Sequence, residues 1–322
     1  MNLVDKVYGL ENVEEKILIE LINCDSVQRL KEISQYGIPD RYYHHKGFSR
    51  YEHSVGVFIL LKRLGANLEE QVAGLLHDVS HTAFSHVVDW FNGDPTKEEY
   101  QDKIHLKIIE NSEIPDILEK QGIDYKKISN FENFSLLEKD SPSLCVDRFD
   151  YSVRELEKEK GFNFVKEFVC NILNKNGQMV FPDKEIAERF ARQYMELNKV
   201  HWSGEQSRIK YYLLAETLKI AEKEKIISFN DLRKTDAFVL NLLEKSKNRE
   251  VLDNLNLLKT NIKIKEVKGG IELKKKFRYI DPEISINGSI KKLSQLSRQY
   301  FDFLRSEREN SQLVKKIKVV RN

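Results

Sequence analysis

The sequence is poor in residues that interrupt regular structure and in residues that cross-link it. Only 14 glycines and 6 prolines occur in 322 residues, which favours helices and argues against a turn-rich all-β fold. Three cysteines are too few for a disulfide framework. No apolar run approaches the roughly 20 residues that a membrane-spanning helix needs, and no basic segment leads into an apolar one at the N-terminus. We therefore expect a cytoplasmic protein without a membrane partner.

An excess of charge of one sign is also missing. The chain has 53 Lys and Arg against 51 Asp and Glu, a net charge of +2. That is too little to identify the whole chain as a nucleic-acid-binding protein. Residues 259–278 and 313–322 are locally basic, but such runs are usually solvated faces. A nucleic-acid partner therefore has only this charge pattern in its favour.

The apolar residues are spaced as in helices over most of the chain. This periodicity predicts helices at about 12–34, 51–64, 67–79, 82–92, 99–111, 142–158, 185–200 and 206–225. Near residue 260 the spacing changes to two residues around Gly269-Gly270, which is a hairpin signal. A final helix is expected at 289–308. We therefore predict a mainly α protein with a helical body over 1–240 and a small mixed α/β part over 241–322 that contains a β-hairpin.

Histidines are concentrated in one stretch. Six of the eight lie within residues 44–86, namely His44, His45, His53, His77, His81 and His86. Most single histidines are neither ligands nor bases, but a group of six calls for an explanation. His77 and Asp78 end an apolar helix, where a carboxylate opposes the helix dipole unless a cation compensates it. His53, in the preceding helix, could reach the same point, and this donor set suits divalent first-row metals.

A further carboxylate for such a site must come from elsewhere in the chain. The candidate is Asp147 in the segment LCVDRFDY. Asp147, Tyr151 and Glu155 recur every four residues and so share a helix face that is separate from the apolar stripe. We expect this polar face to line the metal site.

His53, His77-Asp78 and Asp147 together resemble the H…HD…D signature of the HD-domain metal-dependent phosphohydrolases. The flanking segments 48–56, 73–86 and 147–151 are similar to the deoxynucleoside triphosphate triphosphohydrolase branch, and the likeness extends over about residues 5–156. The resemblance implies an HD-domain helical bundle that binds Mn²⁺, Fe²⁺ or Zn²⁺, with Mg²⁺ as an option. The implied metal ligands are His53, His77, Asp78 and Asp147.

The same resemblance implies catalytic roles for His81, His86 and Asp89. His81 lies four residues after His77, on the same side of a helix, and an imidazole is suited to protonating a leaving oxygen. A histidine that is usual in the branch is Gln101 here, and His105, one turn later, could replace it.

The implied substrate contacts are spread along the chain. Arg50 would hold a phosphate, Gln35 would meet the sugar 3′-hydroxyl, and Arg148 and Tyr151 stand where the branch contacts phosphate and sugar. The segment 199–205 lacks the Tyr-x-His-Lys arrangement of the branch. The replacements that this sequence offers are His201 and Arg208.

Three functions are compatible with these residues. The favoured one is hydrolysis of a dNTP to a deoxynucleoside and triphosphate by metal-activated water. The second is an HD phosphohydrolase for a nucleoside monophosphate or a phosphodiester. The third is a nucleotide- or nucleic-acid-binding module without turnover, against which the intact ligand set argues. We expect the C-terminal third to build a contact in a homo-oligomer, since it contributes no histidine or cysteine after His201.

Overall fold

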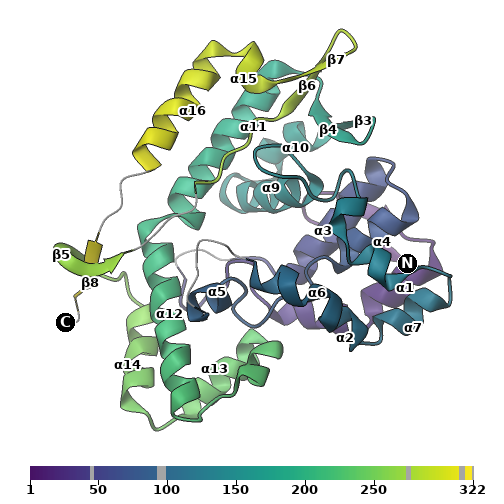
Figure 1. Ribbon diagram of the computed structural model, residues 1–322. Helices are drawn as coiled ribbons and strands as arrows, with labels where there is room; N and C mark the ends of the chain where they lie inside the picture. Colours follow the sequence, from purple (N-terminus) through teal and green to yellow (C-terminus); the bar gives the residue numbers. More distant parts are fainter. Residues whose placement is uncertain (44–46, 93–98, 273–276, 312–315, 321–322) are drawn as a thin grey trace.

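The computed structural model describes residues 1–43, 47–92, 99–272, 277–311 and 316–320, and Figure 1 shows that helices dominate, as predicted. The first half contains α1 (Lys16–Asn23), α2 (Asp25–Gln28), α3 (Arg50–Arg63), α4 (Leu68–Leu76), α5 (Val87–Phe91), α6 (Tyr100–Glu110), α7 (Ile114–Glu119), α8 (Tyr125–Ile128) and α9 (Val146–Lys160). The second half contains α10 (Phe162–Cys170), α11 (Lys184–Leu197), α12 (Glu205–Lys223), α13 (Asp236–Lys245), α14 (Arg249–Leu258), α15 (Leu293–Leu296) and α16 (Arg298–Ser311). Short helical turns are η1 (Arg29–Glu32), η2 (Phe131–Asn133), η3 (Asn198–Trp202) and η4 (Phe229–Arg233).

Two predicted helices are shorter than expected. The expected helix at 82–92 is only α5, because Phe84 and Ser85 have left-handed backbone angles (φ 63° and 45°) that end helical geometry. The expected helix at 289–308 begins as a strand and becomes α15 and α16 only from residue 293. Within the described ranges, no helix is long and apolar enough to cross a membrane.

The central helix of the fold is α3. Ser49 and Glu52 form a capping box at its start, and ten of its residues are buried. Two glycines let its neighbours approach closely. A Cβ on Gly74 of α4 would lie 2.2 Å from Leu61, and a Cβ on Gly56 of α3 would lie 1.8 Å from the guanidinium of Arg154 in α9. Larger residues at either position would push α3 away from its partners.

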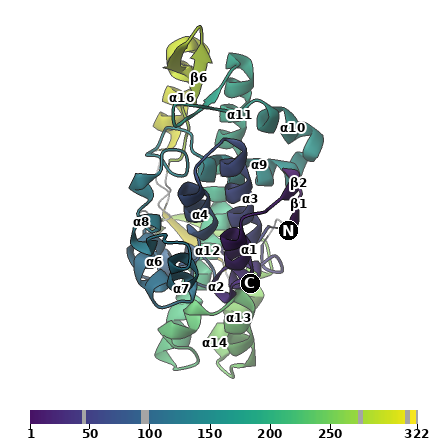
Figure 2. The ribbon, with the colours of Figure 1, turned by 90° about the vertical axis from the view of Figure 1, so that its right-hand side faces the viewer.

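The buried apolar residues form two clusters. One joins α1, α3, α4 and α9 to α11 and also takes in residues of α16, and the other joins α5, α12, α13 and α14. Figures 1 and 2 place α13 and α14 at one end of the molecule, with α15 and α16 at the other. Tyr151 of α9 packs against both clusters, which locates the boundary between them at the polar face of α9.

The strands form three small sheets. A hairpin is made by β1 (Asn2–Asp5) and β2 (Gly9–Asn12), and the largest sheet has the order β3-β4-β6-β7. Its strands are β3 (Leu173–Lys175), β4 (Gln178–Phe181), β6 (Glu283–Ile286) and β7 (Ser289–Lys292). The β4–β6 pair is parallel, with Val180 opposite Glu283, so the C-terminal third completes a sheet that begins before residue 182.

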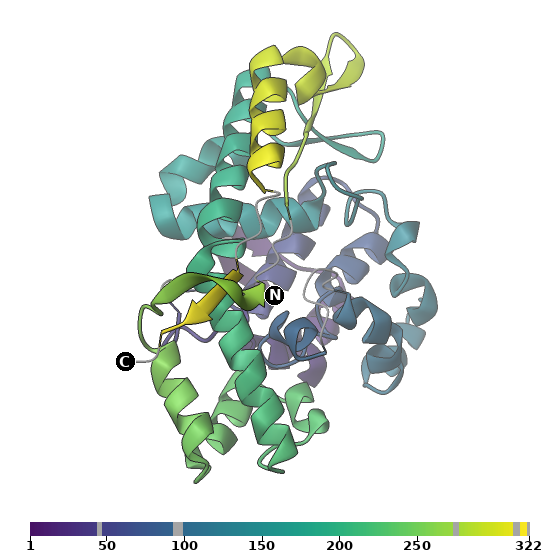
Figure 3. The same cartoon turned by 60° about the vertical axis from the view of Figure 1, so that its left-hand side comes forward.

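The C-terminal part contains a β-hairpin, as predicted, but its turn lies elsewhere. It joins β6 to β7 at Asn287-Gly288, where both residues have positive φ. The expected turn at Gly269-Gly270 is wrong. There β5 (Ile264–Glu272) continues through the glycines with an irregularity in its pairing and pairs with β8 (Lys316–Val319). This two-stranded ribbon lies across α12 (Figure 3), and Gln206 of α12 exchanges two hydrogen bonds with Ile262 beside it.

Candidate metal centre and its cavity

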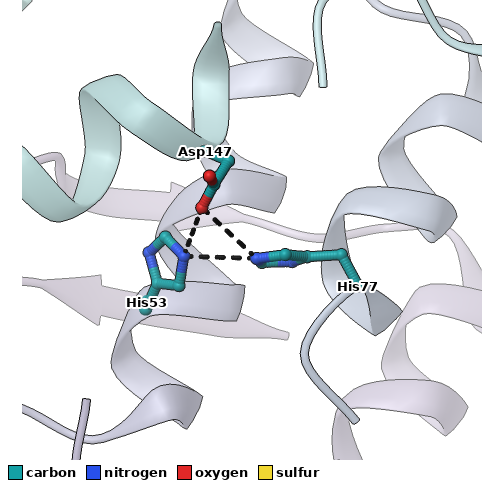
Figure 4. A group of neighbouring side chains, drawn as sticks. All are labelled: His53, His77 and Asp147. Atoms are coloured by element: carbon teal, nitrogen blue, oxygen red, sulfur yellow. Dashed lines mark hydrogen bonds and ion pairs between the residues drawn. The ribbon is translucent and has the colours of Figure 1, made fainter. Parts of the chain in front are cut away.

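Three side chains from three helices converge at the boundary between the two clusters. His53 comes from the first half of α3, His77 caps the C-terminus of α4, and Asp147 lies in the first turn of α9. The Nε2 atoms of the two histidines are 3.2 Å apart. Asp147 Oδ1 lies 2.9 Å from His53 Nε2 and 3.6 Å from His77 Nε2 (Figure 4). Among the described residues, these are the ones that group as candidate metal ligands.

Hydrogen bonds on the far side of each ring fix which nitrogen faces the centre. His77 Nδ1 donates to the carbonyl of Gly74 at 2.7 Å, and His53 Nδ1 donates to Asp150 Oδ2 at 2.7 Å. Both Nε2 lone pairs are thereby directed at each other and at Asp147, so positive charge must lie between them. The spacing of about 3 Å suits atoms that each lie about 2.1 Å from one ion. The residues therefore fit a divalent metal.

Asp78 lies beside this group of three. Its Oδ1 is 3.4 Å from His77 Nε2, and its Oδ2 is 3.9 Å from His53 Nε2. It also accepts from Arg50 Nη1 at 2.7 Å and lies 3.2 Å from His81 Nε2. Although burial raises the pKa of Asp78, Arg50 and the two neighbouring histidines hold it well below its usual range. Its role as a fourth ligand stays a prediction.

The carboxylates stabilise positive charge on the histidines. Burial lowers the pKa of His77, but Asp78 and Asp147 outweigh it and raise this pKa to about 10. The pKa of His53 is also raised, because its hydrogen bonds to Asp147 and Asp150 outweigh its burial. The same charges that favour protons here favour a metal cation.

A buried chain of charges supports His53 from behind. Asp150 accepts from His53 and, at 2.7 Å, from Arg154 Nε, and Arg154 Nη2 donates to Asp5 Oδ2 at 2.7 Å. Asp5 in turn accepts from the amides of Val7 and Tyr8 at 2.8 Å. The N-terminal hairpin is thus tied to a candidate metal ligand. Reasoning from the sequence missed this chain, whose only local sign is the i, i+4 spacing of Asp150 and Arg154.

A cavity of about 250 Å³ opens beside the three candidate ligands. The polar residues that line it are Gln35, Arg50, His77, Asp78, His81, His86, Gln101, Asp102, Glu138, Asp147, Glu155 and Arg278. The aromatic residues that line it are Tyr36, Tyr43, Phe48, Tyr151, Trp202 and Tyr211. The predicted acid–base histidines and three of the predicted substrate contacts, Gln35, Arg50 and Tyr151, therefore meet in one space. His44 and His45 lie outside the described residues.

The two acid–base candidates lie edge to face, with ring centroids 5.1 Å apart. His86 Nδ1 is 3.3 Å from Asp89 Oδ2, and Asp89 is held by the amide of Tyr100 at 3.1 Å. Burial and the charge of Arg50 lower the pKa of His81 well below its usual value, even though Asp78 opposes this. The lowered pKa favours the neutral imidazole of His81.

Three predicted substrate contacts do not reach the cavity. Arg148 turns toward its own loop and donates to the carbonyls of Ser143 and Lys139. His201 pairs with Glu159, and Arg208 Nε donates to the carbonyl of Ser203 at 3.0 Å. Gln101, which stands where the branch usually has a histidine, does line the cavity.

His105 lies behind Gln101 and does not line the cavity. Ser80 bridges the two residues, since its Oγ donates to Gln101 Oε1 at 2.8 Å and lies 3.1 Å from His105 Nδ1. The ring of His105 packs against Phe131. Gln101 thus lines the cavity, and His105 supports it from behind through Ser80.

Two cavity carboxyl groups, Asp102 and Glu138, were missing from the predicted set, whereas Glu155 lines the cavity as the polar face of its helix predicted. Burial, followed by the charge of Asp147, raises the pKa of Glu138 to about 7. Burial raises the pKa of Glu155 to about 8, even though it accepts from Trp202 Nε1 at 2.6 Å. Glu155 was found from its position on the face of Asp147, but Glu138 precedes α9 and has no such pattern. The π-helical turn η3 places Trp202 in the cavity wall.

Comparisons with known proteins agree with this site. The HD domain family matches residues 50–172. An uncharacterized protein YdhJ from Bacillus subtilis is 41% identical over 309 residues, covering 92% of both chains. The metal-dependent phosphohydrolase cns2 from Cordyceps militaris is 37% identical over 209 residues, or 62% of this chain and 60% of that protein.

More distant similarity extends to one named triphosphohydrolase and to solved structures. The deoxynucleoside triphosphate triphosphohydrolase SAMHD1 from Gallus gallus is 25% identical over 245 residues, 68% of this chain but 36% of that protein. A crystal structure of a hypothetical protein from Aquifex aeolicus superposes with a TM-score of 0.68 at 20% identity, covering 99% of this chain and 96% of that one. The fold, the converging ligands and these relatives lead to one conclusion: this chain belongs to the HD-domain metal-dependent phosphohydrolases.

Proposed function

We propose that this phosphohydrolase acts on a nucleotide. The observation that carries the proposal is the cavity lining, which combines candidate metal ligands with six aromatic side chains. A metal site suits a phosphate, and aromatic rings suit a base and a sugar. Gln35 supports this, because its Oε1 is buried and has no hydrogen-bond partner among the described residues. A sugar hydroxyl would satisfy that acceptor.

A divalent metal, when bound, supplies a water of lowered pKa and draws charge from the phosphate. The protein supplies the remaining parts. Arg50 is held by Asp78 and by Ser85 Oγ at 2.9 Å, so its guanidinium can offset charge on the non-bridging oxygens without reorganising. His86, oriented by Asp89, would hold the proton that the leaving oxygen needs.

The leading candidate substrate is a deoxynucleoside triphosphate, cleaved to a deoxynucleoside and triphosphate. Similarity to the chicken triphosphohydrolase supports it, as does the position of Tyr151. The Tyr151 ring lies 6.2 Å from the ring of His53 and is fixed by a 2.9 Å hydrogen bond to Tyr194 and an edge contact with Trp202. A ring fixed in this way would crowd a ribose 2′-hydroxyl.

The second candidate is a nucleoside monophosphate, cleaved to a nucleoside and orthophosphate. It is favoured by the charge of the cavity. Histidines aside, the described lining residues include two basic side chains, Arg50 and Arg278, and several carboxylates. Arg148, expected to hold phosphate, is bonded to backbone carbonyls instead. A single phosphate needs fewer cations than a triphosphate does.

The products distinguish these candidates. Purified protein with Mn²⁺ would be incubated with each dNTP, NTP and nucleoside monophosphate and with a phosphodiester, and the products would be separated by anion-exchange chromatography. Triphosphate indicates the first candidate, and orthophosphate from a monophosphate indicates the second. Asp147→Ala, which removes a candidate metal ligand, is the control and should be inactive. Hydrolysis of the phosphodiester alone, or of none of these compounds, would overturn the proposal.

A further inference from the structure

The loop between α4 and α5 carries both acid–base histidines and has an unusual backbone. Phe84 and Ser85 adopt left-handed angles, which residues with a Cβ seldom do. The loop also packs closely on the turn that follows Gln35, since a Cβ on Gly37 would lie 2.5 Å from the carbonyl oxygen of Phe84. Such a conformation persists only where its surroundings determine it.

The contacts that hold this loop come from residues more than 140 positions later in the chain. The amide of Ala83 donates to the carbonyl of Leu232 at 2.7 Å. The amide of Phe84 donates to Asp236 Oδ1 at 2.7 Å. Leu232 belongs to η4 and Asp236 begins α13, and both lie beyond the residues that the HD domain family matches. The loop is therefore positioned by a part of the chain outside that domain.

Arg29 makes a second connection between the same two segments. Its Nη2 donates to the carbonyls of Val79 and His81 at 2.9 and 2.7 Å, and its Nη1 donates to the carbonyl of Lys234 at 3.1 Å. One planar guanidinium thus spans the loop and the end of η4. His81 itself is one of the residues held in this way.

The carboxylate of Asp236 also holds the segment that carries Gln35. Its Oδ2 accepts from the amide of Ser34 at 2.9 Å, next to Gln35. Ser85 completes this hydrogen-bond network. Its Oγ donates to the carbonyl of Ser34 at 2.8 Å and accepts from Arg50 Nε at 2.9 Å. One buried side chain therefore sets the histidine loop, the Gln35 turn and Arg50 relative to one another.

We propose that Asp236 is a positioning residue for the phosphohydrolase reaction, with Arg29 as its second anchor. Asp236 touches neither the cavity nor the candidate metal ligands. It acts through the amides of Phe84 and Ser34 and so places His81 and His86 against the group that Arg50 holds. The proposal concerns the phosphohydrolase site itself and does not depend on which substrate it takes.

The test compares Asp236→Asn with Asp281→Asn. An asparagine at 236 can accept one amide with its oxygen but presents NH₂ to the other. Asp281 is a matched control, because it is buried and accepts from the amide and hydroxyl of Ser294, far from the loop. We expect Asp236→Asn to lower kcat about 10- to 100-fold on the best substrate of the product panel, with unchanged metal content. Amide exchange in residues 79–86 should be at least about tenfold faster.

Several results would overturn the proposal. One is unchanged kcat and unchanged exchange in Asp236→Asn, another is metal loss in proportion to activity, and a third is the same fall in kcat in Asp281→Asn. If Asp236→Asn does not fold, Arg29→Lys loosens the loop without touching the carboxylate and should give the same pattern. If the native protein hydrolyses no compound in the panel, the nucleotide proposal fails, while the exchange measurement still decides the role of Asp236.

Discussion

Replacing Asp150 by asparagine should weaken metal binding even though Asp150 faces away from the metal centre. Asp150 Oδ2 accepts from His53 Nδ1 and from Arg154 Nε, both at 2.7 Å. An asparagine oxygen in that place can keep both hydrogen bonds but carries no charge. His53 then becomes a poorer donor to a metal, since the carboxylate behind a ligating histidine raises its basicity.

The expected loss is about 10- to 100-fold in metal affinity, or about 1.4 to 2.8 kcal/mol. A loss of folding stability accompanies it, because Asp5 is then the one carboxylate that pairs with Arg154 among the described residues. Burial lowers the pKa of Arg154, but the two carboxylates raise it well above its usual value, so the guanidinium stays charged. Removing one partner of a buried ion pair costs about 3 kcal/mol or somewhat more.

Asp5→Asn separates these two effects. It removes the carboxylate charge at the other end of the same guanidinium, since Asp5 Oδ2 accepts from Arg154 Nη2 at 2.7 Å. Asp5 makes no contact with His53 in this chain of hydrogen bonds. Both variants should lose similar stability in urea unfolding without metal. Titration with Mn²⁺ against a chelator should show the larger loss of affinity in Asp150→Asn. Equal Mn²⁺ affinity in the two variants would refute the reasoning.

Other predictions follow from the cavity and from the buried polar groups. Tyr151→Ala should reduce the preference for dATP over ATP, whereas Gln35→Ala should slow both without metal loss; equal rates on the two nucleotides in the native protein would refute the steric argument. Burial and then His77 lower the pKa of His105 to about 4, below its unfolded value of about 6.5, so the folded state binds fewer protons. Stability should then fall by about 3 kcal/mol between pH 6.5 and 4, and His105→Gln should show a smaller fall in urea unfolding. Light scattering should show a homo-oligomer, and a monomeric mass would contradict that expectation.

The local features of the site could be predicted from the sequence, because they depend on helix geometry. Spacing and capping place His53 and His77 at adjacent helices, and the four-residue repeat places Tyr151 on the face of Asp147. Contacts with distant segments could not be predicted. Arg148 shares the expected helix with Asp147, yet its guanidinium is taken by carbonyls of the preceding loop.

Contacts between distant segments also explain one wrong prediction, the turn at Gly269-Gly270, and one residue that the sequence did not indicate, Asp236. The Gly269-Gly270 pair has the composition of a turn, but β5 continues through it, and the pairing with β8 resumes at Ile271 after a shift of register. Nothing in the local sequence of Asp236 points to the amide of Phe84, because the two residues meet only when α13 packs beside the loop between α4 and α5.

The parallel pairing of β4 with β6 bears on the order in which the protein assembles as it is synthesised. Val180 pairs with Glu283, so the four-stranded sheet cannot close until β6 and β7 have left the ribosome. The converging side chains His53, His77 and Asp147 and the supporting Asp150 are all made before residue 151, and Asp236 follows well before β6. Since nascent chains fold from the N-terminus and long-range strand pairing is slow, we expect the metal centre to form first, the loop of His81 to be fixed second, and the sheet to close last.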